Sequence, residues 1–164
     1  MLAIVLSAVL ALTSHGSAHA TGAFPAKGIV VPGKSIGGIT LGESTTAVQA
    51  HWGKRYTVCS YCDKLTWFYE YQTGEPLGAG VTFVNKRVVA VFTLGSPAGW
   101  GEKGLMMGDP ISNVYNVFSA TGDKQCIGYT ALTVREGNAT MSFYSASGVV
   151  YGYALTAASE PTCE

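Results

Sequence analysis

Charged residues are scarce in this sequence. Asp, Glu, Lys and Arg make up 12% of its 164 residues, against roughly 25% in an ordinary globular domain. Ten basic and ten acidic residues cancel to a formal net charge of zero, without a basic stripe or polybasic patch. Because nucleic-acid binding depends on clustered Lys and Arg, we expect no nucleic-acid partner. Sparse charge together with 21 glycines suits an exported, β-rich protein.

Residues that carry common catalytic chemistry are also few. His51 is the only histidine beyond residue 20, and no two of the scattered acids stand out as a general acid and base pair. The stretch Gly33–Gly37 matches the G-x-S-x-G pattern of a hydrolase nucleophile. That pattern needs a helix directly after it, whereas Ile36–Leu41 reads as extended. We therefore expect no enzymatic activity, no catalytic residue and no cofactor.

The first twenty residues contain an apolar run that is too short to span a membrane. The run Leu2–Leu12 is broken only by Ser7 and holds about eleven residues, whereas a spanning helix needs roughly 20. Ala18-His19-Ala20 then forms an A-x-A cleavage pattern. We predict a signal peptide over residues 1–20, no stable membrane insertion after cleavage, and a secreted protein of the extracellular space, periplasm or cell envelope.

Four cysteines follow the predicted cleavage site: Cys59, Cys62, Cys126 and Cys163. An even number in an exported chain indicates disulfides, and of three possible pairings we favour Cys59–Cys62 with Cys126–Cys163. Zinc would need a second ligand pair beside the CxxC motif, so we expect no metal site. Thiol–disulfide oxidoreductases place a CxxC motif at a helix N-terminus. Here a strand-like stretch follows the motif, which leaves an exported oxidoreductase using Cys59 and Cys62 as the alternative function.

The sequence does contain an internal repeat of a short pattern. Gly38–Val48 and Gly104–Val114 both read Gly, apolar, any residue, apolar, Gly, acid, four unrestricted positions, then Val. A large aromatic residue, Trp52 or Phe118, follows each Val by four positions. The copies lie sixty-six positions apart, the difference between 104 and 38. An echo of fixed period predicts a duplicated architecture.

Each copy predicts a helix followed by strands. Ser44 can cap a helix over about Thr45–Trp52, and Asp109 can cap one over about Pro110–Ser119. Strand-like runs follow at Leu65–Tyr71, Gly80–Val84, Val88–Leu94, Tyr129–Arg135, Ala139–Tyr144 and Val149–Leu155. The final runs of the two copies match, Val88–Leu94 against Val149–Leu155. A tight hairpin is expected at Asn85-Lys86.

These elements predict an α+β fold made of two tandem repeats, each a short helix packed on an antiparallel β-sheet. After the signal peptide we expect a flexible lead-in at residues 21–37, repeat unit 1 at 38–95, a linker at 96–103 and repeat unit 2 at 104–164. A single unit of about sixty residues has a marginal core. Joining two units buries their open edges and supports one larger core.

The signatures Gly42–Val48 and Gly108–Val114, in this helix-then-sheet order, resemble the β-lactamase-inhibitor-protein fold. The same unit occurs as a single copy in small lipoproteins of the bacterial outer-membrane assembly machinery. The resemblance covers about Gly38–Leu155, in pattern rather than in residue identity. It implies an inhibitor-like, non-catalytic binding protein with the sheet as its contact face, and it does not imply inhibition of a β-lactamase.

Aromatic residues alternate along the predicted strands. They are Trp67, Tyr69, Tyr71, Tyr144, Tyr151 and Tyr153. These rows either pack beneath the helices or lie on the opposite face of the sheet. Because Tyr and Trp give large contact area at low entropic cost, we predict that these six residues contact a partner. We expect a secreted, monomeric protein that binds another protein or a cell-envelope component.

Overall fold

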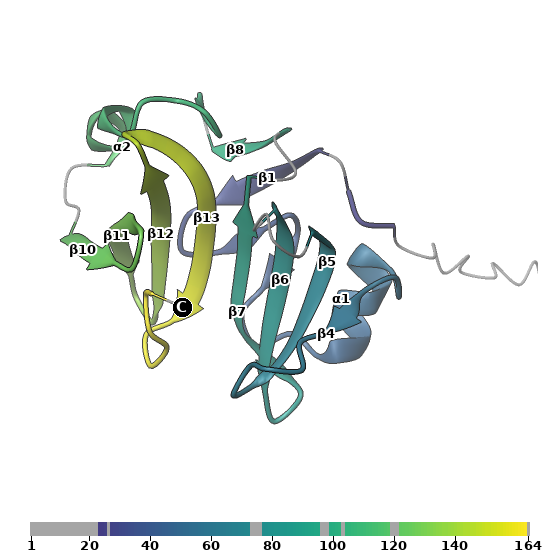
Figure 1. Ribbon diagram of the computed structural model, residues 1–164. Coiled ribbons are helices and arrows are strands. Elements are labelled where there is room, and N and C mark those ends of the chain that lie inside the picture. Colours follow the sequence, from purple (N-terminus) through teal and green to yellow (C-terminus); the bar gives the residue numbers. More distant parts are fainter. Residues whose placement is uncertain are drawn as a thin grey trace, which may run out of the picture.

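An eight-stranded antiparallel sheet dominates the computed structural model, which describes residues 23–25, 27–72, 77–95, 99–102, 104–118 and 122–163. Its strands are β4 (Thr57–Val58), β5 (Leu65–Gln72), β6 (Leu77–Val84), β7 (Arg87–Leu94), β10 (Gly122–Cys126), β11 (Tyr129–Glu136), β12 (Ala139–Ala146) and β13 (Val149–Ala157). They lie in the order β10-β11-β12-β13-β7-β6-β5-β4, with β7 and β13 adjacent at the centre (Figure 1). The six predicted strands are confirmed, and β4 and β10 add the two edges.

A smaller, five-stranded sheet was not expected from the sequence. It consists of β1 (Lys27–Val31), β2 (Ser35–Ile36), β3 (Ile39–Thr40), β8 (Gly99–Glu102) and β9 (Leu105–Met106), in the order β3-β2-β1-β8-β9. Strands β1 and β8 are parallel, and Gly28 pairs with Trp100. Residues 27–31 and 35–36 of the expected lead-in and residues 99–102 of the expected linker are therefore paired strands rather than loose connections.

Trp100 explains why these two segments are ordered. Its side chain is fully buried, and its indole Nε1–H donates a hydrogen bond to the Pro25 carbonyl oxygen at 3.0 Å. The ring lies 5.3 Å from that of Trp52 and 5.5 Å from that of Phe24. Burial of a side chain this large gives both strands a shared anchor.

Helix α1 (Thr45–Trp52) has the predicted bounds. The Ser44 side-chain oxygen accepts a hydrogen bond from the Ala47 backbone N–H at 3.2 Å, which makes it the N-cap. Gly53 ends the helix with a positive φ of 82° and donates its N–H to the Gln49 carbonyl. A left-handed residue at this position favours glycine.

Helix α2 (Ser112–Val117) is shorter than predicted, and Asp109 is not its cap. The Asp109 carboxylate instead accepts a hydrogen bond from the Met106 N–H at 2.7 Å, which closes the turn after β9. The helix stops because Phe118 has extended backbone and its ring packs 5.0 Å from that of Phe143. The predicted last residue, Ser119, lies outside the described residues.

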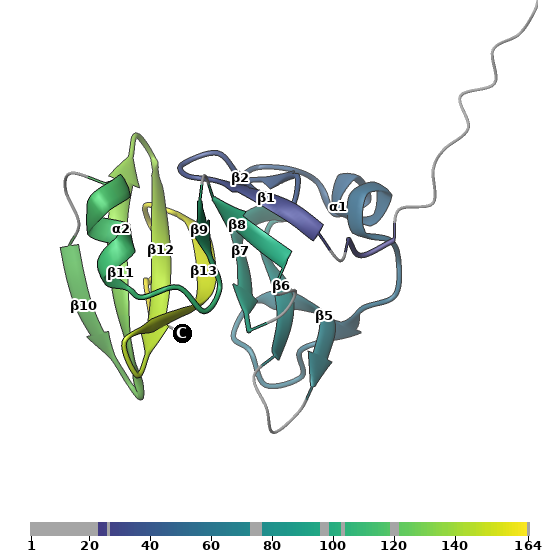
Figure 2. The ribbon, with the colours of Figure 1, turned by 90° about the horizontal axis from the view of Figure 1, so that it is seen from above.

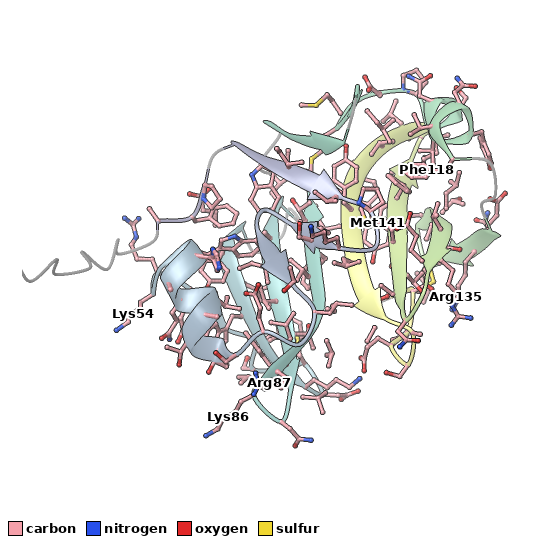
Figure 3. All side chains as sticks on the ribbon, turned by 180° about the vertical axis from the view of Figure 1, so that it is seen from behind. Lys54, Lys86, Arg87, Phe118, Arg135 and Met141 are labelled. Carbon is pink, nitrogen blue, oxygen red and sulfur yellow. A yellow bond between two sulfur atoms is a disulfide. The ribbon has the colours of Figure 1, made fainter. Side chains whose placement is uncertain are left out.

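The main core lies between the large sheet and a second layer formed by α1, the small sheet and α2. Seen from above, both helices lie on the same side of the large sheet (Figure 2). The largest fully buried side chains come from both layers: Trp52, Trp100, Tyr69, Tyr153 and Phe143. From behind, Phe118 and Met141 point into this layer, whereas Lys54, Lys86 and Arg135 project outward (Figure 3).

Both helices are preceded by the same backbone bonds to the last strand of their half. These are Gly42 N–H to Val88 O (2.8 Å), Val88 N–H to Glu43 O (2.9 Å), Gly108 N–H to Val150 O (2.7 Å) and Val150 N–H to Asp109 O (2.8 Å). The bonds align Val88 with Val150, one position later than the sequence match with Val149. Val149 is 39% exposed, whereas Val88 and Val150 are buried.

Both predicted disulfides are present. Cys59 is bonded to Cys62 in the connection between β4 and β5, and Cys126 is bonded to Cys163. Each pair has its Cα atoms 5.6 Å apart. Neither described helix is long and apolar enough to cross a bilayer. The predicted signal peptide, residues 1–20, lies outside the described part of the chain.

Candidate functional site

The structure divides the six predicted contact residues between the two faces of the large sheet. Trp67, Tyr69 and Tyr153 face the helices and are at most 5% exposed. Tyr144 and Tyr151 lie on the opposite face, where Tyr144 is itself only 4% exposed. Buried side chains offer no area to a partner, so we remove Trp67, Tyr69, Tyr153 and Tyr144 from the contact surface. The side chain of Tyr71 lies outside the described residues.

The two tyrosines that face the helices are hydrogen-bonded to the second layer through their hydroxyls. Tyr69 donates a hydrogen bond to the Gly53 carbonyl oxygen at 3.3 Å, and Tyr153 donates one to the Leu105 carbonyl oxygen at 3.2 Å. A buried tyrosine hydroxyl needs such an acceptor, since an unmade hydrogen bond there is costly. The alternating aromatic residues of β5 and β13 that face the helices therefore pack beneath the second layer.

The opposite face of the large sheet, called the open face below, carries a second apolar cluster. Its larger members are Phe68, Phe92, Leu94, Tyr129, Tyr144 and Tyr151. Four of these, Phe68, Phe92, Leu94 and Tyr129, were missed in the sequence. Phe68 lies between Trp67 and Tyr69 in the sequence. Because side chains alternate between the two faces of a strand, this position could have predicted that Phe68 lies on the opposite face from its neighbours.

A bulge brings Tyr151 onto the open face. Tyr144 pairs with Gly152 and Ser145 pairs with Val150, which leaves Tyr151 as the extra residue of β13. Val150 is fully buried in the main core, whereas Tyr151 packs with the open-face cluster. A bulge re-aims a side chain in this way without breaking the rest of the ladder.

Two glycines leave room for the aromatic rings. Gly80 pairs with both Phe68 and Phe92 in the sheet, and a Cβ at Gly80 would collide with the Phe92 ring. Gly152 lies between Leu94 and Tyr144 in the same way. A Cβ at Gly152 would collide with the Thr93 carbonyl oxygen. The rings therefore lie over bare backbone.

The aromatic rings of the open face form two groups. The rings of Phe68 and Phe92 are 6.1 Å apart and nearly perpendicular. Tyr129 lies 5.2 Å from Tyr144 and 6.2 Å from Tyr151, also close to edge-on. Edge-to-face pairs of this kind contribute about 0.5–1.5 kcal/mol beyond the area that they bury. They hold both groups in fixed positions.

The C-terminal segment lies beside these rings and is held at three points. Cys163 is bonded to Cys126, Tyr144 donates its hydroxyl to the Thr162 carbonyl oxygen at 3.2 Å, and Lys64 forms an ion pair with Glu160. A cavity of about 610 Å³ lies next to this segment. Its apolar lining comes from Phe68, Phe92 and Leu94, and its charged lining from Asp63, Lys64 and Glu160.

Burial raises the pKa of a tyrosine on each face of the large sheet. Burial, and to a smaller degree the charge of Tyr129, raises the pKa of Tyr151 to about 12. Burial, and to a smaller degree Tyr56, raises the pKa of Tyr69 well above its usual value of 10.0. A neutral phenol can donate a hydrogen bond while presenting an apolar ring, which suits a contact surface.

The other sequence motifs are not assembled into a site. Cys59 and Cys62 lie between two strands and not at a helix N-terminus, and the Cys59 N–H donates to the Thr66 carbonyl oxygen at 2.9 Å. His51 is exposed on α1, and Ser35 lies in β2 with a turn after it rather than a helix. Within the described ranges, no group of three His, Cys, Asp or Glu side chains could hold a metal ion.

Comparison with known proteins gives one structural likeness. No family model and no curated protein matches the sequence. The fold is similar to that of an extracellular protein containing an SCP domain from Bacillus anthracis str. Ames, with a TM-score of 0.51 and 12% sequence identity. The similarity covers 71% of this chain and 44% of that protein, so this chain spans less than half of its length.

This likeness corrects the resemblance to the β-lactamase-inhibitor-protein fold, which was wrong. The signatures that carried the resemblance serve local geometry. Gly42 and Gly108 have positive φ values of 83° and 92° and form the turns that lead to the two helices. Turns of this kind occur in many folds, so they do not identify one. What holds is the class: an α+β chain of two sheets and two short helices in its described part.

Proposed function

We propose that this chain is an exported, non-catalytic binding protein whose open face contacts another protein or a cell-envelope component. The observation that carries the proposal is the set of aromatic rings on the open face, beside a cavity of about 610 Å³ with a charged rim. Aromatic anchors within a polar rim are typical of protein contact surfaces. The contact residues are the partly exposed members of the cluster, Phe68, Leu94, Tyr129 and Tyr151, and the buried rings of Phe92 and Tyr144 support them.

Three observations support export. The sequence begins with an apolar run and an A-x-A pattern. Two disulfides join all four cysteines, as expected in an oxidising compartment. The structurally similar protein from Bacillus anthracis is an extracellular protein.

We also propose that the chain arose by tandem duplication of a helix-plus-sheet unit. Support comes from the sixty-six-position echo and from the matched bonds that precede α1 and α2. The strand order is symmetric about the centre, with β4-β5-β6-β7 on one side and β13-β12-β11-β10 on the other. The resulting continuous sheet doubles the width of the open face.

Site-directed photo-crosslinking tests the contact surface. A benzophenone amino acid replaces either Tyr151 on the open face or Tyr115, which is 49% exposed on α2. Each protein is then incubated with the exported fraction of the native cells. We expect one crosslinked species from position 151 and none from position 115. Equal labelling at both positions, or no labelling at 151, would contradict the proposal.

A double variant provides the matched loss of function. Phe68→Ala with Tyr151→Ala should abolish formation of the complex, whereas Tyr115→Ala should leave it intact. Circular dichroism of each variant separates a lost contact from a lost fold.

The rival function, a thiol–disulfide oxidoreductase using Cys59 and Cys62, requires a reduction potential in the range of such enzymes, roughly −270 to −120 mV. A lower potential supports a structural bond.

A further inference from the structure

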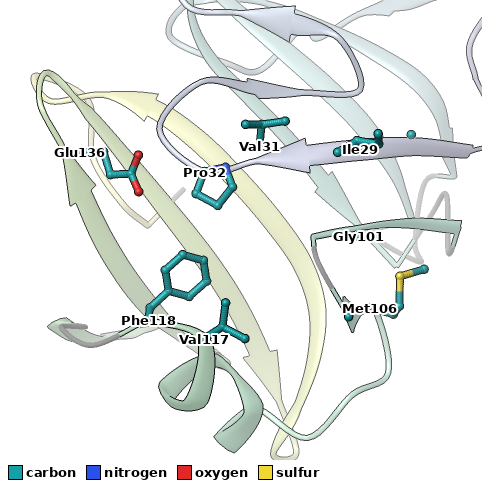
Figure 4. A pocket seen from close by; sticks show the side chains of 10 residues that line it. Ile29, Val31, Pro32, Gly101, Met106, Val117, Phe118 and Glu136 are labelled. Atoms are coloured by element: carbon teal, nitrogen blue, oxygen red, sulfur yellow. The ribbon is translucent and has the colours of Figure 1, made fainter.

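A second cavity, of about 810 Å³, lies on the other side of the molecule between β1 and the end of α2 (Figure 4). We call it the β1–α2 cleft. Its described lining residues are Gly28, Ile29, Val31, Pro32, Gly101, Gly104, Met106, Val117, Phe118 and Glu136. None of them belongs to the open face. The cleft is therefore separate from the proposed contact surface.

The apolar walls of the cleft are exposed to solvent. The exposed fractions are 69% for Ile29, 37% for Val31, 39% for Met106 and 43% for Val117. Leaving such side chains in water forgoes about 25 cal/mol for each Å² that a ligand could cover. Single exposed apolar residues need no explanation, but a contiguous set around a cavity marks a binding surface.

The end of α2 forms one wall of the cleft. Val117 is the last helical residue, and Phe118 has extended backbone with its ring 5.0 Å from that of Phe143. Val117 and Phe118 both line the cleft.

Two of the lining glycines, Gly28 and Gly101, are packed closely against other residues. A Cβ at Gly28 would lie 2.8 Å from the Trp100 indole, and one at Gly101 would collide with Met106. Trp100, which lies behind Gly28, is fully buried and hydrogen-bonded through its indole nitrogen. The backbone at Gly28 is therefore a supported part of the wall.

Glu136 is the only charged side chain among the described lining residues. It lies at the end of β11 against Gly33, where a Cβ would collide with the carboxylate. Within the described part of the chain, no hydrogen bond or ion pair involves this carboxylate. The cleft thus combines apolar walls with one unpaired negative charge at its margin.

We propose that the β1–α2 cleft binds an amphiphile with an aliphatic chain and a cationic head group. The chain covers Ile29, Val31, Met106 and Val117, and the head group pairs with Glu136. The volume falls within the range of roughly 300–1,000 Å³ that small-molecule sites occupy. Charge complementarity selects the cation, because an anionic head group would meet only the carboxylate. This site is independent of the open face.

Three twelve-carbon probes test the proposal on the full chain, the two ionic ones below their micellar concentrations and the alcohol below its solubility limit. They are dodecylammonium, dodecanol and dodecanoate, so the aliphatic chain is constant while the head-group charge changes. Binding is followed by calorimetry and by NMR shifts of the Ile29, Met106 and Val117 methyl groups. We expect dodecylammonium to bind most tightly and dodecanoate most weakly. Equal binding of all three, or shifts confined to the open face, would overturn the proposal.

Two variants with matched controls assign the contacts. Glu136→Gln should weaken dodecylammonium about two- to fivefold, as for an exposed ion pair, and leave dodecanol unchanged. Val117→Trp should fill the cleft and abolish binding of both probes. Glu70→Gln and Val58→Trp change exposed residues elsewhere and should have no effect. Analytical ultracentrifugation of the ligand-free chain tests whether a second copy occupies the cleft. Self-association of the chain, if Val117→Trp abolished it, would identify a second copy as the occupant and overturn the proposal.

Discussion

At the scale of single residues, Gly80 and Gly152 determine whether rings can lie on the open face. A side chain at Gly80 would meet the Phe92 ring, which can rotate at some cost. A side chain at Gly152 would meet the Thr93 carbonyl oxygen, which belongs to the neighbouring strand and cannot move alone. The second position should therefore tolerate substitution less well.

Alanine substitution tests this difference. We expect Gly152→Ala to lower the free energy of unfolding by roughly 1–3 kcal/mol, as for overpacked cores, and Gly80→Ala by less. Gly122→Ala is the control, because this glycine is exposed on the edge strand β10. Urea unfolding measures all three. A cost at Gly152 no larger than that at Gly122 would refute the packing argument.

The buried tyrosines should make stability sensitive to alkali. The folded chain holds the Tyr151 proton up to a pKa of about 12, whereas the unfolded chain loses it near 10.0. Between these values the unfolded chain binds fewer protons, so the free energy of unfolding falls as pH rises. Tyr69, whose pKa is also raised, acts in the same direction.

Tyr151→Phe should flatten this dependence, since phenylalanine does not ionise. Urea midpoints between about pH 9 and pH 12 would show a smaller decline than in the unchanged chain. Tyr61→Phe serves as the control, because Tyr61 is 75% exposed. A decline that persists undiminished in Tyr151→Phe would exclude this tyrosine as a cause.

At the scale of elements, the two helices differ in how they begin. The N-cap of α1 is Ser44, whose side-chain oxygen accepts the Ala47 N–H. At α2 the N-cap position is Ile111, which makes no side-chain capping bond. The acids that precede the two helices, Glu43 and Asp109, both accept a backbone N–H three residues earlier in the chain. Only α1 should therefore depend on a capping side chain.

Ser44→Ala should lower the free energy of unfolding by about 1 kcal/mol, the usual value of a lost N-cap. Ser44→Asp, which keeps an acceptor, should restore most of it. Ser112→Ala is the matched change at α2 and should be nearly neutral, because α2 has no such cap. Thermal or urea unfolding distinguishes these outcomes, and an equal loss in Ser44→Ala and Ser112→Ala would rule out the cap.

Elements with local signals were predictable from the sequence. Ser44 and Gly53 mark both ends of α1, and Asn85 and Lys86 have the positive φ values of 49° and 61° that a tight hairpin needs. Asp109 misled because a carboxylate before a helix can also close the preceding turn, as it does here. Local patterns do not distinguish these two uses.

Features that depend on distant partners were not predictable. Strand β1 is ordered by pairing with β8, from residue 27 to residue 99, which no local pattern encodes. The prediction of the contact surface was partly wrong for a related reason. Alternation shows that Trp67 and Tyr69 share a face, but only the second layer determines which face is covered. The bulge at Tyr151 then breaks the strict alternation on which such reasoning relies.

At the scale of the whole molecule, the two disulfides should contribute unequally. Cys126–Cys163 joins residues 37 positions apart and ties the C-terminal segment to β10. Cys59–Cys62 joins residues three positions apart within one connection. Closing the longer loop removes more entropy from the unfolded chain, roughly 4 kcal/mol against roughly 2 kcal/mol.

Paired serine substitutions test this ranking. Cys126→Ser with Cys163→Ser should lower the urea midpoint more than Cys59→Ser with Cys62→Ser. The first pair should also loosen the Tyr144 hydroxyl from Thr162, which hydrogen exchange in β12 would report. Equal losses from both pairs, with unchanged exchange, would show that loop length does not control their contributions.

The parallel pairing of β1 with β8 also fixes an order of assembly. The hairpin of β1 and β2 can form as soon as residues 27–36 exist, but its second edge has no partner until residue 99 has been made. Closing so long a loop is slow and must follow faster local steps. We therefore expect β1, the first described strand to be synthesised, to be among the last to dock, so that the small sheet is completed only after the large one.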